Sequence, residues 1–452
     1  MTHKLTLPND FQKIIKDLLG TEYNSFFDSL NTPSPASIRI NPKKNYPLES
    51  ESAIPWSRYG QYLSTRPVYT LDPWLHAGGY YVQEPSSMFL EQAVTSNIDL
   101  SKPLVALDLC AAPGGKSTHL LSLLNAESLL VSNETIRSRA TILSENIQKW
   151  GHANVMVTNN DPASFSRLSG LFDLIVIDAP CSGEGLFRKD SLAVNEWSLD
   201  NVELCGMRQR RILKDIWPAL KQNGVLVYCT CTYNHTEDEE TMNWLSDEGD
   251  AEFLTIPTLP EWGIVESSVK NIVGYRFYPH KLKGEGFFIS AVRKREPQEE
   301  IQVFNKNQLS KIKKDDNPIM SWITNPEDFS FFNYNGIIGC VPACSADLIA
   351  FLVKNLNVKL MGTPLATNKR GKLVPEHAAA LSIHLNKEKF LNMDLNLEQA
   401  LGYLRKDALS INTIEKGFGL ATYQGAPLGW LNFISNRINN MYPPNWRIRM
   451  RS

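Results

Sequence analysis

The sequence lacks long apolar runs, and this absence limits the classes of protein that the chain can represent. No stretch approaches the ~18 consecutive apolar residues that a membrane helix needs. The first residues, MTHKLTLPNDFQK, also lack the apolar core of a secretory signal. We therefore expect a cytoplasmic protein without a membrane partner. Nothing in the sequence suggests an obligate dimer, so we expect a monomer.

Cysteine pairs at metal-binding or disulfide spacing are also missing. The seven cysteines include no C-x-x-C pair and show no regular spacing, which argues against a zinc site or a disulfide framework. We expect free thiols, no bound metal and a reducing compartment. The apolar fraction of 42% is sufficient for several cores, and the length corresponds to about three domains.

A marked excess of charge is absent as well, because the 452 residues carry a formal net charge of −2. Contact with a polyanion must then come from a local excess of basic residues. The segment from Leu401 to Ser452 has such an excess, with the two acidic residues Asp407 and Glu415 against seven basic ones. The basic residues are Arg405, Lys406, Lys416, Arg437, Arg447, Arg449 and Arg451. Charge alone leaves open a nucleic-acid contact or a solvated helical face.

The middle of the chain alternates between strand and helix patterns, which is typical of a parallel α/β sheet. The strand patterns are VALDL, SLLVSNE, NVMVTN, LIVIDAP and GVLVYCT, with helical segments between them. A hairpin that ends near Lys294 is expected to close this sheet as an antiparallel edge. We divide the chain into a helical and irregular lead-in without a large core of its own (1–95), the α/β domain (96–295), a linker (296–303) and a mixed C-terminal region (304–452).

A glycine loop, LDLCAAPGGKST, follows the first predicted strand. It is not a P-loop, because Cys110 stands where the first glycine of G-x-x-x-x-G-K-[ST] belongs, and it also departs from G-x-G-x-x-G. Such a loop still lets a ligand approach the backbone at the start of a helix. Glu134 ends the second strand, where an acid can bind ribose hydroxyls, and Asp161 follows the third, where it can also cap a helix. The pattern favours a nucleoside-bearing cofactor, either NAD or S-adenosylmethionine.

Two cysteines, Cys181 and Cys231, each follow a strand of the predicted sheet, and Cys181 comes directly after DAP. Residues just beyond the carboxyl ends of parallel strands face the ligand crevice, so two thiols there indicate covalent chemistry beside the cofactor. The other five cysteines are interpreted as buried apolar residues. Cys229 is one of them, although strand alternation predicts that it shares a face with Cys231.

Four separated motifs, YYVQEPSSM, AAPGGKS, DAPCSGEGLFRKD and YCTCTYNHTEDEE, occur in the order found in the Sun-type (Fmu) RNA cytosine-C(5) methyltransferases. The chain resembles this family over about residues 1–295, with two departures: Cys229 replaces a common serine, and the acidic run at 237–239 reads EDE. The strings GKLVPEHAAALS, QGAPLGW and NMYPPNWRIR are similar to the RNA-binding extension of the bacterial small-subunit rRNA methyltransferase F group. The resemblance implies a class I, Rossmann-like sheet and a mixed α+β C-terminal region with a PUA-like part near 398–452.

The same resemblance implies transfer of a methyl group from S-adenosylmethionine to carbon 5 of cytosine in 16S rRNA. Cys231 would be the nucleophile that adds to carbon 6 of the base, Cys181 would act in product release, and Asp178 would hold or protonate the ring nitrogen. The residues implied in cofactor binding are Ala111, Ala112, Pro113, Gly114, Gly115, Lys116, Glu134, Asp161 and Asp178.

The implied partner is small-subunit rRNA or the ribosomal subunit, with a flipped or single-stranded cytosine as the target. The candidate contacts to RNA phosphates are Arg188, Lys189, Arg447 and Arg449. Three C-terminal aromatic residues either form core or stack on bases, namely Trp430, Tyr442 and Trp446.

Four alternatives stay open at this point. Cys181 is the nucleophile if the order of the DNA cytosine methyltransferases applies, in which the Pro-Cys thiol attacks. The chain can also be a non-catalytic RNA-binding assembly factor on a methyltransferase scaffold, although such a factor is expected to lose thiols and acids that are present here. A transfer RNA substrate and an NAD-linked or thiol-dependent oxidoreductase are the remaining two.

Overall fold

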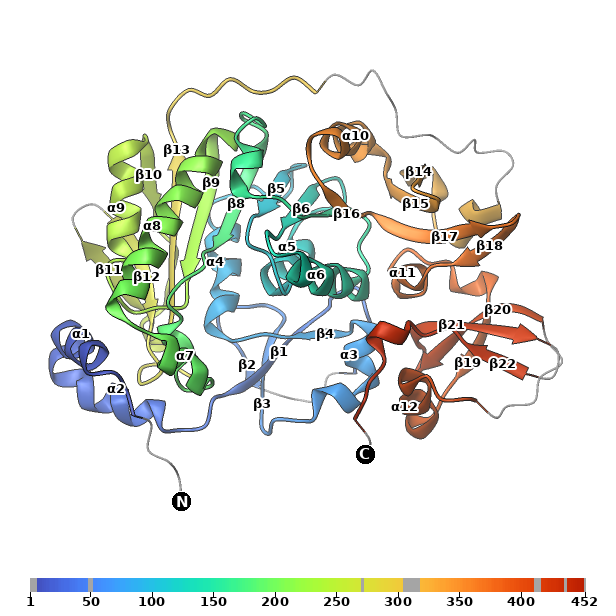
Figure 1. The fold of residues 1–452 in the computed structure, drawn as a ribbon, viewed down its shortest axis with the longest axis horizontal. Coiled ribbons are helices and arrows are strands. Elements are labelled where there is room, and N and C mark those ends of the chain that lie inside the picture. Colours follow the sequence, from blue (N-terminus) through green and yellow to red (C-terminus); the bar gives the residue numbers. More distant parts are fainter. Residues whose placement is uncertain are drawn as a thin grey trace.

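The computed structural model describes residues 6–47, 52–269, 272–303, 318–409, 416–434 and 437–450. Figure 1 shows a central α/β region, an N-terminal region that runs beneath it, and a C-terminal region beside it. Two of the charged residues counted in the C-terminal segment, Glu415 and Arg451, lie outside the described residues. Within the described ranges, no helix is both long enough and apolar enough to cross a membrane.

The central region is built on a mixed ten-stranded sheet. Its order is β11-β12-β13-β9-β8-β5-β6-β7-β16, and β10 pairs with β13. The parallel strands are β5 (Val105–Asp108), β6 (Leu129–Asn133), β7 (Val155–Thr158), β8 (Phe172–Asp178) and β9 (Leu220–Thr230). The antiparallel strands are β10 (Ala251–Leu254), β11 (Val265–Val269), β12 (Ile272–Phe277), β13 (Phe287–Lys294) and β16 (Val358–Met361). The α/β sheet with an antiparallel edge that the sequence predicts is confirmed.

The strand order reverses direction at β5. β6 and β7 lie on one side of β5, and β8 and β9 lie on the other. In open α/β sheets a ligand binds outside the carboxyl ends of the strands at such a reversal. The crevice is therefore placed where Asp108 ends β5 and Asp178 ends β8.

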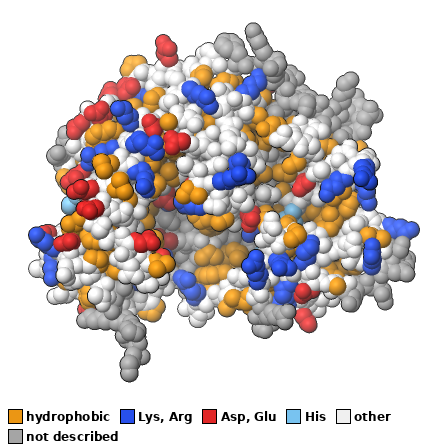
Figure 2. Space-filling view, viewed as in Figure 1, with side chains coloured by type: hydrophobic (Ala, Val, Ile, Leu, Met, Phe, Trp, Pro, Cys, Tyr) orange, Lys and Arg blue, Asp and Glu red, His pale blue; other side chains and the backbone are white. Residues whose placement is uncertain are grey.

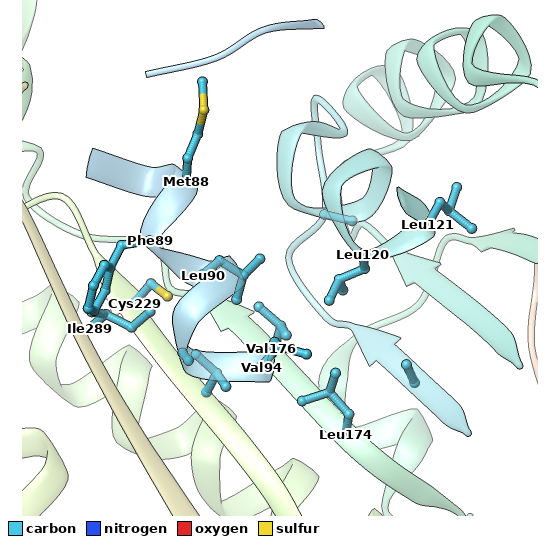
Figure 3. Close-up of a cluster of buried hydrophobic side chains, with 14 of the residues drawn as sticks. Met88, Phe89, Leu90, Val94, Leu120, Leu121, Leu174, Val176, Cys229 and Ile289 are labelled. Carbon is cyan, nitrogen blue, oxygen red and sulfur yellow. The ribbon is translucent and has the colours of Figure 1, made fainter. Parts of the chain in front are cut away.

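Strand residues alternate between two apolar layers. Leu174 and Val176 of β8 belong to the layer shown in Figure 3, which is covered by α4 (Leu90–Thr95), α5 (Gly115–Leu123) and α6 (Arg137–Trp150). Ile175 and Ile177 belong to the opposite layer, which is covered by α8 (Leu199–Ile216), α9 (Glu239–Glu248) and α10 (Ala346–Asn355). Because helices cover both faces, the strands are nearly continuous apolar runs.

The N-terminal region contains an antiparallel sheet of order β2-β3-β1-β4, which the sequence did not reveal. Its strands are β1 (Ala36–Ile40), β2 (Ser52–Ala53), β3 (Gly60–Leu63) and β4 (Tyr80–Val82), and its helices are α1 (Asn9–Leu19), α2 (Tyr23–Leu30) and α3 (Pro73–Ala77). The expectation of a helical and irregular lead-in was wrong, because strands of two to five residues carry too few alternations to give a pattern.

Arg39 of β1 ties this sheet to the central region. Its Nε donates to Gln83 Oε1 at 2.7 Å, and its Nη2 donates to Thr118 Oγ1 of α5 at 2.6 Å. The guanidinium carbon lies 4.6 Å from the ring centroid of Trp150 at the end of α6. The side chain is fully buried, and this burial lowers the pKa of Arg39 to about 9.

The C-terminal region contains two four-stranded sheets. The first comprises β14 (Phe329–Tyr334), β15 (Ile337–Pro342), β17 (Thr363–Lys369) and β18 (Lys372–Pro375), and α11 (His377–Leu381) follows it. The second comprises β19 (Leu391–Asp394), β20 (Lys416–Tyr423), β21 (Ala426–Ile434) and β22 (Arg437–Asn440), with α12 (Leu397–Arg405) beside it. Between β15 and β17 the chain supplies β16, which pairs with β7. The region 304–452 therefore completes the central sheet.

The contacts of Arg39 predict a measurable loss of stability when the side chain is removed. Arg39→Ala should lower the free energy of unfolding by about 3 kcal/mol. The substitution removes charged hydrogen bonds and leaves the buried side-chain oxygen Oε1 of Gln83 without this donor. Urea unfolding followed by tryptophan fluorescence measures the effect. The exposed Arg66 provides the matched control, Arg66→Ala. Equal unfolding midpoints for the two variants would contradict this role.

Candidate active site

The glycine loop connects β5 to α5 and leaves the first turn of α5 open to a ligand. Gly114 precedes the helix with a φ of +118°, a backbone conformation that favours glycine. No side chain in the described part of the protein caps the helix. Ala111 and Ala112 are buried and Pro113 is exposed. The free amide groups of the first turn can therefore bind an anionic group such as a carboxylate.

Asp108 lies at the end of β5 beneath this loop and is fully buried. Ser117 Oγ of α5 donates to its Oδ2 at 2.7 Å, and its Oδ1 has no hydrogen-bond partner among the described residues. Burial raises the pKa of Asp108 to about 7. The sequence reasoning did not select Asp108, although its place at the end of the strand pattern VALDL was the available signal.

Glu134 follows β6 and lies beside the glycine loop. Its side chain is nearly buried, and its Oε1 accepts a hydrogen bond from the Ile136 amide at 2.9 Å. Arg139 connects Glu134 to the glycine loop. Its Nη1 lies 3.6 Å from Glu134 Oε2, and its Nη2 donates to the Ala112 carbonyl of the loop at 2.8 Å. Ile136 leaves 52% of its surface exposed next to Glu134, which suits contact with an apolar ring face. The sequence reasoning overlooked Ile136.

Asp161 follows β7 and caps a short helical turn. Its Oδ1 accepts a hydrogen bond from the Ala163 amide at 3.1 Å, and its Oδ2 lies 3.5 Å from the guanidinium of Arg211 on α8. The side chain remains 46% exposed. The capping role that the sequence allowed is therefore present, and contact with a bound adenine stays a prediction.

The two thiols selected from the sequence meet at the carboxyl ends of β8 and β9. Cys181 Sγ lies 3.2 Å from Cys231 Sγ, and both side chains are partly exposed. The hydrogen bond with Cys231 and then burial raise the pKa of Cys181 well above its ordinary value. Cys181 therefore keeps its proton at neutral pH and can donate it toward the Cys231 sulfur.

Asp178 and Lys116 form an ion pair in the same crevice. Asp178 ends β8, and its Oδ2 lies 2.8 Å from Lys116 Nζ of α5. Burial by itself would lower the pKa of Lys116, but the carboxylate of Asp178 reverses this effect and the pKa lies above its ordinary value. The Asp178 side chain stays 43% exposed and so remains available to a bound base.

Cys229 is separated from Cys181 and Cys231 by burial. It is the second-to-last residue of β9, is fully buried, and belongs to the apolar layer of Figure 3. Burial raises the pKa of Cys229 well above its ordinary value. The strand ends at Thr230, so Cys231 leaves the sheet and the alternation rule does not extend to it. The interpretation of Cys229 as a buried apolar residue agrees with this environment.

The buried carboxylate of Glu237 holds the Cys181 loop against the segment that follows Cys231. Its Oε2 accepts hydrogen bonds from the Ser182 amide and from Gln209 Nε2, both at 2.9 Å. Its Oε1 accepts hydrogen bonds from Ser182 Oγ and from Asn234 Nδ2. One carboxylate therefore fixes both cysteine loops and α8.

Glu184 connects the same two loops from the other side. Its Oε2 accepts hydrogen bonds from the backbone amides of Tyr233 at 2.7 Å and Asn234 at 3.1 Å. The Gly185 amide also donates to the Cys231 carbonyl at 2.8 Å. Sequence reasoning gave no role to Glu184, and it noted Glu237 only as part of the acidic run at 237–239. The available signal was an acid shortly after each cysteine, which surface loops also show.

Two of the predicted phosphate contacts pair with the buried carboxylate of Glu285. The Arg188 side chain is 5% exposed, and its Nε donates to Glu285 Oε2 at 2.9 Å. Lys189 is exposed, and its Nζ lies 3.5 Å from the other oxygen of Glu285. Glu285 neutralises the charge of Arg188 inside the protein, so this environment does not favour an RNA contact by Arg188, and that contact stays a prediction. The exposed Arg447 and Arg449 remain candidates.

The aromatic residues of the C-terminal segment divide into two groups. Trp430 and Tyr442 are 1% and 0% exposed and form core. Trp446 is half-buried, and the ammonium of Lys149 at the end of α6 lies 5.1 Å from its ring centroid. The C-terminal segment is thus packed against the central region.

Comparison with known proteins gives three matches to family models. Residues 98–293 match 16S rRNA methyltransferase RsmB/F, residues 7–85 match the N-terminal domain of 16S rRNA methyltransferase RsmF, and residues 390–448 match the methyltransferase RsmF PUA domain. Among solved structures, a methyltransferase homolog protein from Pyrococcus horikoshii has a TM-score of 0.54 at 26% identity, covering 64% of this chain and 96% of that chain. NSun6 from the same organism, solved with SFG, has a TM-score of 0.53 at 21% identity, covering 65% and 100%.

Curated relatives match over nearly the whole length. The ribosomal RNA small subunit methyltransferase F of Aliivibrio fischeri is 31% identical over 98% of this chain and 98% of that protein. The protein of the same name from Photobacterium profundum is 29% identical over the same shares. The Rossmann-like methyltransferase fold with N-terminal and PUA domains is thereby established, and the chain belongs to the family of ribosomal RNA small subunit methyltransferase F.

Proposed function

We propose that this protein methylates carbon 5 of a cytosine in 16S rRNA with S-adenosylmethionine, through a covalent adduct on Cys231. The observation that supports this proposal is the pair of thiols 3.2 Å apart, at the sheet edge that also holds the glycine loop and Asp178. The partner is small-subunit rRNA or an assembled ribosomal subunit, and the protein acts as a monomer.

The described residues fit S-adenosylmethionine. The uncapped first turn of α5 suits the methionine carboxylate, the carboxylate of Glu134 suits the ribose hydroxyls, and Asp161 suits the adenine. When bound, S-adenosylmethionine supplies a methyl group on a positively charged sulfur, which is an electrophile. The NAD alternative receives no support, because the loop lacks the dinucleotide pattern and the family is one of methyltransferases.

The side chains of the crevice activate the base. Cys231 adds as a thiolate to carbon 6 of cytosine, and the ring becomes an enamine whose carbon 5 accepts the methyl group. The ring nitrogen takes up a proton during this addition. Asp178, held by Lys116, accepts a charge-assisted hydrogen bond from the protonated nitrogen, and this bond promotes the addition. Cys181, after its own proton has passed to solvent, takes the proton from carbon 5 as a thiolate. Elimination of the Cys231 thiolate and loss of the proton on the ring nitrogen then restore the aromatic ring and free the product.

The environment of Cys181 favours this assignment over the reverse one. Cys181 keeps its proton because its neighbours raise its pKa, and it can donate that proton toward the Cys231 sulfur. Once the Cys231 sulfur is bonded to the base, this contact changes and Cys181 is free to act in the release step. Loss of the thiols would be expected for a non-catalytic assembly factor, and both are present.

Trapping of the covalent adduct tests the roles of the two cysteines. Cys181→Ala, Cys231→Ala and the parent are incubated with 16S rRNA and radiolabelled S-adenosylmethionine and then run on a denaturing gel. A labelled protein–RNA adduct should persist in Cys181→Ala and be absent from Cys231→Ala, because release is blocked only in the first. Cys344→Ala, at an exposed thiol, serves as the control and should behave like the parent.

The other outcomes of that experiment are equally informative. An adduct that persists in Cys231→Ala exchanges the two roles. Methyl transfer to tRNA but not to 16S rRNA would show that the substrate is tRNA and not 16S rRNA. No transfer by the parent to either RNA would favour the assembly-factor alternative.

The hydrogen bonds of Glu237 predict a positioning role. Glu237→Gln replaces an acceptor by a group with two N–H donors, which then faces the donors of Ser182 and Gln209. The displaced Cys181 loop should lower kcat about a hundredfold while the KM for RNA and the affinity for S-adenosylmethionine change little. Glu240→Gln, at the exposed neighbouring acid, is the matched control. A loss confined to KM would contradict the positioning role.

A further inference from the structure

A cavity of about 210 Å³ lies between β4, α3 and the last turns of α6, where Figure 1 shows these three elements side by side. It is lined by Leu75, Gly78, Tyr80, Tyr81, Val82, Asn146, Lys149 and Trp150. None of the catalytic or cofactor roles assigned above uses these residues. The cavity is nevertheless close to the glycine loop, because Asn146 Nδ2 donates to the Pro113 carbonyl at 2.8 Å.

The lining combines ring surfaces with a positive charge. Tyr80, Tyr81 and Trp150 supply three aromatic rings, and Lys149 supplies an ammonium, while no carboxylate belongs to the described lining. Tyr80 is buried and its hydroxyl donates to Asp72, whereas Tyr81 and Val82 keep surface open to solvent. Aromatic faces bind unstacked bases of any sequence, and an ammonium binds phosphate.

The surroundings of the cavity extend this chemistry. Lys149 lies over Trp446, and the exposed Arg447 and Arg449 follow directly in sequence. Figure 2 shows Lys and Arg side chains gathered on this face over the region where α3, α6 and β21 meet. Burial lowers the pKa of Lys149 although the nearby carboxylate of Glu145 acts in the opposite direction, so a bound anion would further stabilise the charged form of Lys149. A basic surface thus leads from the C-terminal region to the cavity.

The cofactor does not account for this cavity. Its ribose site at Glu134 lies before the first residue of α6, whereas Lys149 and Trp150 are the last two residues of that helix. At 1.5 Å per residue the two ends of α6 are about 20 Å apart. The adenosine part of the cofactor, at the start of α6, is therefore distant from the aromatic end of the cavity.

We propose that this cavity holds an unstacked nucleotide of the rRNA that flanks the target cytosine, with its base against Tyr81 and its phosphate at Lys149. The inference rests on the proposed function in that it takes the substrate to be RNA. It adds a binding site for a second nucleotide outside the crevice of Cys181 and Cys231. Such a site fixes the strand on one side of the target base before the thiol attacks.

Filling the cavity tests the proposal. Val82 is 38% exposed on the edge strand β4, so Val82→Trp introduces a ring into the cavity without disturbing a core. Val68→Trp is the matched control, because Val68 is 55% exposed in the same region and does not line the cavity. The cytosine that the parent enzyme methylates is first mapped by bisulfite sequencing. Binding is then measured by fluorescence anisotropy on a synthetic 16S rRNA fragment around that cytosine. Whole 16S rRNA is used if no methyl transfer occurs.

Val82→Trp should weaken RNA binding about tenfold, the loss expected for one stacked base, and should leave the affinity for S-adenosylmethionine unchanged. Lys149→Gln should weaken RNA binding and reduce its dependence on salt. An abasic residue placed at one position near the target cytosine should weaken binding to the parent but cause no further loss in Val82→Trp.

Three results would overturn the proposal. The first is RNA binding by Val82→Trp and Lys149→Gln equal to that of Val68→Trp. The second is a parallel loss of cofactor affinity in Val82→Trp, which would assign the cavity to the cofactor. The third is a loss of RNA binding in Val82→Trp that adds to the loss caused by the abasic residue at every position tested. Because binding is measured without methyl transfer, a failure of the proposed chemistry leaves this test intact.

Discussion

The register of three parallel strands determines where the candidate catalytic groups meet. β8 pairs with β5 on one side and with β9 on the other, and Asp178 lies opposite Cys229 in the second pairing. A slip of one residue would turn every inward side chain toward the opposite layer. Since the strands end at the same edge, the glycine loop, Cys181 and Cys231 leave the sheet together, although they are far apart in the sequence.

Two buried carboxylates then convert neighbouring loops into one rigid site. Burial of a carboxylate is unfavourable unless hydrogen bonds replace water. Glu184 and Glu237 obtain these bonds from neutral donors, namely backbone amides, Trp197 and side-chain amides. Burial raises the pKa of Glu184 to about 6, and the negative charge of Glu237 contributes to the raised pKa of Cys181. The groups that hold the loops therefore also help to keep the Cys181 thiol protonated.

Much of the central region could be predicted from the sequence, because long apolar strands and helical spacing are local signals. One of the helical segments expected between the strands appears as Arg137–Trp150, and the hairpin ending at Lys294 is present. The short N-terminal strands gave no such signal. The burial of Arg188 depends on Glu285, 97 residues away, and no local pattern reveals that partner. The same limit applies to Glu184 and Glu237, whose roles exist only after two distant loops meet.

The pairing of β16 with β7 bears on how the chain folds as it is synthesised. β16 is made about 200 residues after β7, so this edge of the central sheet stays uncovered until the first part of the C-terminal region has left the ribosome. An uncovered edge strand is a site for aberrant pairing with other chains. β16 also completes the sheet beside Asp161, since the Asn159 amide donates to the Asn357 carbonyl, directly before β16, at 2.9 Å. The nascent chain therefore completes this edge of the sheet only when the segment that precedes the PUA domain is available. A chain truncated before that segment is prone to aggregation.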